Sequence, residues 1–115
     1  MQRLFALLLI PIILCCGKTT PLEPENNPPH KPVPIVPADG KKNISSSINL
    51  QWSGGDPDQG DIVTYDIHVG VSDSPDQVKS NSSINSYQTQ NLKFSTTYFW
   101  KIVSHDNHGN MTSGD

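Results

Sequence analysis

The 115-residue sequence predicts an all-β sandwich in which two antiparallel sheets face each other, after a leader and a proline-rich linker. From Lys41 on, apolar residues recur at every second position, which is the period of a strand with one buried face. No window carries the apolar stripe of a helix, and turn-forming segments rich in Gly, Asp, Asn and Pro separate the alternating runs. Short strands at this spacing favour a sandwich.

Composition limits the remaining possibilities. The net charge is only −3 and no basic stretch occurs, so a nucleic-acid partner is not expected. A hydrophobic content of 34% together with ten prolines indicates one small domain beside an extended segment. The only two cysteines are the neighbours Cys15 and Cys16, so the folded part holds no internal disulfide.

Residues 1–16 are predicted to be a signal peptide. Arg3 supplies a positive charge, and the apolar run that follows is shorter than the about 20 residues that span a bilayer. The sequence "ILCCGK" then resembles the lipobox of bacterial lipoproteins, with Cys16 as the acceptor of the lipid, although Leu14 stands where a small residue is usual. We therefore expect a cell-envelope lipoprotein, periplasmic or on the cell surface, whose partner is the membrane; without lipid, it would be secreted.

Residues 17–31 are predicted to be a proline-rich linker, and residues 32–115 the domain. The prolines of "KTTPLEPENNPPHKPVPIVP" exclude a helix and favour an extended, polyproline-like chain. Such a chain acts as a semi-rigid spacer.

Three stretches alternate strongly enough to be predicted as strands: "SINLQW", "VTYDIHVG" and "TYFWKIVSHD". A weaker strand is expected around residues 84–89. After the turn "DNHGN" only "MTSGD" remains, so the last strand is expected to be short or missing. Residues 111–115 then form either the stub of a final strand or the end of a fragment, or a partner strand completes the sheet. The fragment is the preferred interpretation, because an unpaired edge costs stability.

The segment "NLKFSTTYFWKIV" resembles the corner before the sixth strand of fibronectin type III domains. In that family a leucine precedes a threonine by four residues and a tyrosine by six, as Leu92 precedes Thr96 and Tyr98 here. The resemblance implies that the hydroxyl of Tyr98 bonds to the backbone just upstream. Phe94 stands where the family often has proline.

The same resemblance covers residues 32–115 and implies an immunoglobulin-like sandwich. Trp52 matches the core tryptophan of the second strand, and Tyr65 the aromatic residue at the start of the third. The expected core residues are Trp52, Tyr65, Leu92, Tyr98 and Trp100.

Two loops are candidates for recognition. The loops after the second and the sixth strand are expected at the same pole, because the third and sixth strands are antiparallel neighbours. The residues that this places together are Asp56, Asp58, Asp61, Asp106 and His108, with His105 beside them.

"GGDPDQGD" itself is interpreted as a turn, with a weak cation site as the alternative. Pro57 presets the backbone and Asp side chains cap local N–H groups. Carboxylates also suit calcium, but position 12 from Asp56 is Ile67, where an EF-hand needs glutamate. His105 and His108 lack the further ligands of a closed zinc site, so neither a metal nor a cofactor is predicted.

No arrangement of nucleophile and base is visible, so we do not expect an enzyme. The predicted function is a non-catalytic module for adhesion, spacing or contact with surface proteins or polysaccharide. Two alternatives stay open. The first is the N-terminal spacer or carbohydrate-binding module of a larger secreted hydrolase, of which this chain would be a fragment. The second is a calcium-stabilised surface module.

Overall fold

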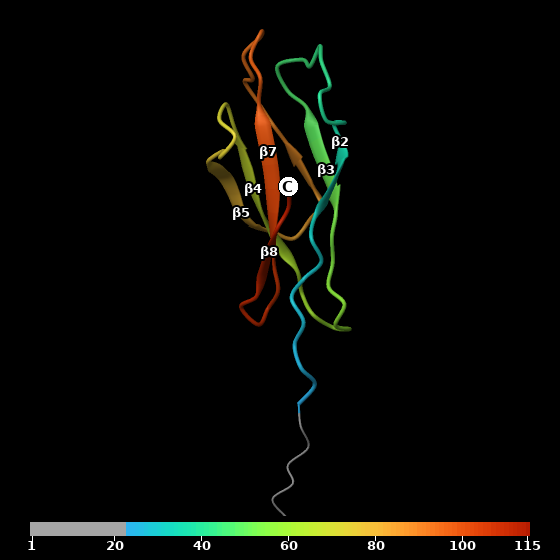
Figure 1. Cartoon of the computed structure of the whole chain (residues 1–115). Helices are drawn as coiled ribbons and strands as arrows, with labels where there is room; N and C mark the ends of the chain where they lie inside the picture. The colour runs from blue at the N-terminus through green and yellow to red at the C-terminus, as the bar shows by residue number, and fades with distance from the viewer. Residues whose placement is uncertain (1–22) are drawn as a thin grey trace, which may run out of the picture.

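The computed structural model describes residues 23–115, which form seven strands and no helix (Figure 1). The predicted signal peptide and Cys16 lie outside the described residues. Among the residues described, no helix is long and apolar enough to cross a membrane. The strands are β2 (Val33–Val36), β3 (Asn49–Ser53), β4 (Thr64–Gly70), β5 (Gln77–Ser82), β6 (Ser86–Gln88), β7 (Phe99–His105) and β8 (Met111–Ser113).

The strands form two antiparallel sheets, which confirms the predicted sandwich. One sheet has three strands in the order β2-β3-β6, and the other has four in the order β5-β4-β7-β8. The longest pairing joins β4 to β7 without a break, from Thr64 opposite His105 to Gly70 opposite Phe99. The final strand, β8, is short and pairs three residues with the end of β7.

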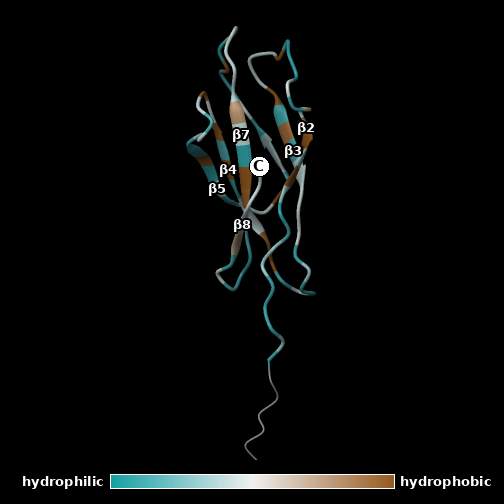
Figure 2. Cartoon of the chain, in the orientation of Figure 1, coloured by the Kyte–Doolittle hydropathy of each residue, from teal (hydrophilic) through white to brown (hydrophobic). Residues whose placement is uncertain are grey.

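The core lies between the sheets and follows the predicted alternation. Five apolar residues are at most 3% exposed, and they come from β3, β4 and β7: Leu50, Trp52, Tyr65, Ile67 and Ile102. The Trp52 and Tyr65 rings meet edge to face, with centroids 5.6 Å apart at an interplanar angle of 72°. Figure 2 shows hydrophobic and hydrophilic residues alternating along β3. Burying each large side chain stabilises the fold by about 1.5–3 kcal/mol.

The other three expected core residues, Leu92, Tyr98 and Trp100, lie at the margin and are half-buried. The Tyr98 hydroxyl accepts a 3.0 Å hydrogen bond from the Lys93 N–H, which is the upstream backbone contact that the family resemblance implies. Trp100 packs against the buried cluster from the start of β7.

Two strands were not predicted. β2 falls in the proline-rich segment, and Pro34 is tolerated there because β2 is an edge strand whose other side needs no partner. β5 is also an edge strand. Five of its six residues are exposed, so it carries no apolar alternation to detect. The weak strand expected around residues 84–89 forms only at β6.

Candidate functional site

The two loops proposed for recognition meet at one pole of the sandwich. The β3–β4 loop (residues 54–63) and the β7–β8 loop (residues 106–110) lie at the same end, since β4 and β7 pair along their full length (Figure 1). Two hydrogen bonds join them. The Ile62 N–H donates to Asn107 Oδ1 at 3.0 Å, and His108 Nε2 lies 3.2 Å from Asp61 Oδ1.

Within the β3–β4 loop, the three aspartates stand together around a turn. One oxygen of each of Asp56, Asp58 and Asp61 lies within 4.8 Å of the others. The Asp58 N–H donates to Asp56 Oδ1 at 2.8 Å, and the Asp61 N–H donates to the Asp58 carbonyl at 3.2 Å. This is the local capping expected of a turn.

His105 does not join this group. It points to the outer face of the four-stranded sheet, where its Nε2 lies 2.7 Å from Asp66 Oδ2. The other oxygen of Asp66 accepts the Asn81 N–H at 3.0 Å. His105 therefore belongs to a cross-strand polar pair on the outer face of the sheet, at the end of β7 that precedes the β7–β8 loop.

Asp106 organises the β7–β8 loop from a buried position, with 8% of the residue exposed. Its Oδ1 accepts the N–H groups of His108 at 2.9 Å and Asn110 at 2.8 Å, and its Oδ2 accepts Asn26 Nδ2 at 2.8 Å. Burial raises the pKa of this carboxyl, but the hydrogen bonds from Asn26, Asn110 and His108 outweigh it and lower the pKa to about 2.

A third segment completes the pole: residues 26–32, which we call the N-terminal strap. Most of it falls within the range assigned to the linker, yet it lies against the domain. Asn27 binds both oxygens of Asp58, through its backbone N–H at 2.6 Å and its Nδ2 at 2.9 Å. These two hydrogen bonds lower the pKa of Asp58. Asn26 holds Asp106 by a single hydrogen bond, from its side-chain amide to Oδ2.

The rest of the strap contacts both sheets. The His30 N–H donates to the Gly55 carbonyl at 2.8 Å, and the His30 carbonyl accepts Ser104 Oγ at 3.3 Å. The Pro29 carbonyl accepts Thr112 Oγ1 at 2.7 Å. Pro29 and Pro32 are buried. Sequence patterns gave no sign of these contacts, because a proline-rich stretch without apolar alternation carries no strand signal.

The chain just before the strap and the β3–β4 loop enclose an open cleft of about 530 Å³. Its ionisable lining is mostly acidic, with Glu23, Glu25, Asp58 and Asp61 beside His108. Next to it, Asp56 Oδ2 and Asp61 Oδ2 are buried without a hydrogen-bond partner in the described part of the chain. Buried carboxylate oxygens are normally paired, so these two are the feature of the pole that a cation would satisfy.

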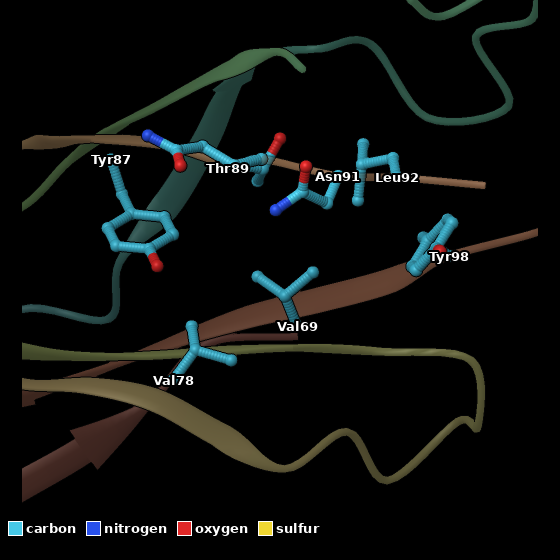
Figure 3. Close-up of a pocket in the computed structure, with 8 residues that line it drawn as sticks. Val69, Val78, Tyr87, Thr89, Asn91, Leu92 and Tyr98 are labelled. Carbon is cyan, nitrogen blue, oxygen red and sulfur yellow. The ribbon is translucent and has the colours of Figure 1, made fainter. Parts of the chain in front are cut away.

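A second, smaller cleft of about 200 Å³ opens between the two sheets on the side of the edge strands β5 and β6 (Figure 3). Its lining combines aliphatic and tyrosine side chains with amides: Val69, Val78, Tyr87, Thr89, Gln90, Asn91, Leu92 and Tyr98. These groups offer apolar contact and hydrogen bonds to a ligand or a partner side chain.

Comparison with known families agrees with this architecture. The model of the fibronectin type III domain matches residues 38–114, which is most of the chain. The chain belongs to the fibronectin type III family. No curated protein and no solved structure matches it.

Within this fibronectin type III domain, the matched range begins after β2 and after the N-terminal strap. The strap is therefore an addition on the N-terminal side of the part that the family model recognises. Domains of this family generally serve as non-catalytic binding or spacer modules, and the same architecture hosts many functions.

Proposed function

We propose that the protein is an exported, membrane-anchored lipoprotein that presents a single fibronectin type III domain for adhesion, spacing or contact with surface proteins or polysaccharide. The observation that carries the proposal is the order of the segments. A short apolar run ends at Cys15 and Cys16, a proline-rich stretch follows, and a non-catalytic type of module comes last. One lipid chain gives only marginal membrane binding, so stable anchoring implies the multiple acylation of a lipoprotein.

Metabolic labelling with radioactive palmitate tests the anchor. In cells that express the full chain, the protein should take up label and fractionate with membranes. Cys16→Ala should abolish both, whereas the matched control Cys15→Ala should retain them. Label that survives in Cys16→Ala and is lost in Cys15→Ala would move the acceptor to Cys15. An unlabelled, freely released wild-type protein would refute the anchored form and leave a secreted module.

A calcium-stabilised module is the second candidate, and the two buried oxygens of Asp56 and Asp61 favour it. Together with Asp58 they offer three carboxylates within 4.8 Å. The residues fit the ion, because Ca²⁺ takes oxygen ligands from carboxylates and neighbouring carbonyls. The bound ion would supply positive charge to a group of carboxylates that otherwise repel one another.

Calorimetry of the full chain with added calcium or with a chelator tests this candidate. Calcium at about ten times its dissociation constant would stabilise the native state by about 1.4 kcal/mol and raise the melting temperature. Asp61→Asn should remove that response, while Asp73→Asn, a change in an exposed loop away from the pole, should preserve it. A melting temperature that calcium leaves unchanged in the wild-type protein would eliminate the candidate.

A further inference from the structure

We infer that the N-terminal strap is fixed to the β3–β4 and β7–β8 loops. Residues 26–115 then move as one rigid unit, and this pole is where the preceding chain is attached. The strap would then fix the direction in which the chain enters the domain. This lock of the strap onto the loops involves only the described residues, whereas the orientation that it gives to the domain rests on the proposed N-terminal anchor.

The first support is the path of the strap, which continues that of the sheet. In the β2–β3 pair, Val33 lies opposite Ser53. Three residues back from Val33 and two residues forward from Ser53, His30 meets Gly55, and a backbone hydrogen bond forms there at 2.8 Å, with the register shifted by one residue. Another three residues bring Asn27 to Asp58. The strap therefore follows the antiparallel path of β2 past the end of the sheet.

The second support is the kind of bond at its end. Asn27 gives two hydrogen bonds to one carboxylate and Asn26 gives one to another. Hydrogen bonds to ionised acceptors are roughly twice as strong as those between neutral groups. Lowered pKa values of Asp58 and Asp106 accompany these contacts. Two separate loops thus hold adjacent residues of the strap.

The third support is that the strap joins the two sheets. Its His30 N–H reaches the loop after β3, while carbonyls of Pro29 and His30 accept the side chains of Thr112 on β8 and Ser104 on β7. A segment held from both sheets cannot swing toward either one without breaking hydrogen bonds to the other. This is why we assign it a locking role.

The lock has a consequence for recognition. The chain leaves the domain past the β3–β4 and β7–β8 loops, and the β6–β7 loop lies at the other end (Figure 1). If the chain is anchored on its N-terminal side, as proposed above, the β6–β7 end therefore points away from the anchor. That end carries Phe94, which is 77% exposed. The β3–β4 and β7–β8 loops are then partly occupied by the strap, and the β6–β7 loop lies at the end opposite to the one where the chain enters the domain.

Amide hydrogen exchange followed by NMR on the full chain in detergent micelles tests the lock. The reporter is the His30 N–H, and the Ile67 N–H in the buried strand β4 reports on the sandwich. In the wild-type protein, we expect His30 to exchange at least about tenfold more slowly than an unprotected amide. Asn27→Ala should speed exchange at His30 by about fivefold, the effect of one net hydrogen bond, and leave Ile67 unchanged.

Two further variants make the result decisive. Gln59→Ala removes an exposed amide side chain from the same loop and should leave His30 unaffected. Asp58→Ala removes both acceptors of Asn27 and should have a larger effect than Asn27→Ala. If Asp58→Ala also speeds exchange at the Ile67 N–H, that variant has destabilised the whole sandwich. The result for Asn27→Ala then decides whether the strap is locked. A wild-type His30 amide that exchanges at the unprotected rate, or one that does not respond to Asn27→Ala, would overturn the inference.

Discussion

The two ends of the sandwich are held together by different kinds of interaction. At the strap end, hydrogen bonds to the carboxylates of Asp58 and Asp106 hold three segments together, beside the buried prolines Pro29 and Pro32. At the β6–β7 end, two tyrosines, three aliphatic side chains and three polar ones line a cleft of about 200 Å³ that remains open. The Leu92 N–H bonds the Ser46 carbonyl there at 2.8 Å.

The two ends therefore differ in how tightly they are held. The strap end is held by hydrogen bonds to ionised carboxylates, which form only in one geometry, so this end should keep the strap in a fixed position. The β6–β7 end keeps an open cleft and carries Phe94, which is 77% exposed. Variants at the two ends should therefore differ in size of effect and in their response to acid.

The largest effect is expected at the strap end, from Gly54→Ala. A Cβ built at Gly54 would lie 2.5 Å from the Tyr65 hydroxyl oxygen, and Tyr65 is 3% exposed and packed on Trp52, so it has no room to move. Overpacking of this kind costs about 1–3 kcal/mol. Urea denaturation should show the loss. Ser53→Ala, at an exposed position one residue earlier, should stay within about 0.5 kcal/mol of wild type. Equal urea midpoints for the two variants would mean that the Tyr65 side chain can move aside to make room for the added methyl group.

Which parts of this fold could be predicted follows from where each strand sits. The strands β3, β4 and β7 were found because one face of each is buried, so every second residue is apolar. The edge strands β2 and β5 bury almost nothing and left no such pattern. The spacing of Leu92, Thr96 and Tyr98 implied a hydrogen bond between the Tyr98 hydroxyl and the upstream backbone, and the Lys93 N–H makes it.

The candidate site was predicted in part for the same reason. The β3–β4 and β7–β8 loops were placed together from the pairing of β4 and β7, and Asp61 does meet His108. The contacts of Asn26 and Asn27 could not be foreseen, since they depend on the register of β2, a strand that Pro34 concealed. With β2 assigned, continuing the pairing of Val33 with Ser53 would have placed Asn27 opposite Gln59, one residue away from its actual partner Asp58.

A smaller effect is expected at the opposite end, from Tyr98→Phe. The variant removes the acceptor of the Lys93 N–H but keeps the ring. Because Tyr98 is half-buried and Lys93 exposed, water can replace the lost partner, and the cost should be about 0.5–1.5 kcal/mol. Thermal unfolding measures it. Tyr87→Phe, which removes another hydroxyl that lines the cleft, is the matched control and should cost less. A loss as large as that of Gly54→Ala would show that both ends are equally rigid.

The most local effect is expected from acid, at the strap end. The pKa of Asp106 is lowered in the folded protein from the usual 3.8 to about 2, and the pKa of Asp58, which faces Asp106 and His108, is lowered too. A lowered folded pKa adds stability that is fully present above the unfolded pKa and is lost as pH falls through the folded one. The strap should therefore loosen between about pH 4 and pH 2.

Carboxyl and side-chain amide NMR shifts follow this loosening directly. The Asn26 Nδ2 protons should move toward solvent-exposed values as Asp106 takes up its proton, while the tryptophan fluorescence, from Trp52 in the core and Trp100 packed against it, stays native-like. Asp106→Asn keeps an acceptor for the loop N–H groups but cannot titrate, so the acid step should shrink to the part that Asp58 contributes. If Asp106 instead titrates near 3.8, its hydrogen bonds to the strap and loop are not formed in solution, and the two ends of the sandwich differ less than their contacts imply.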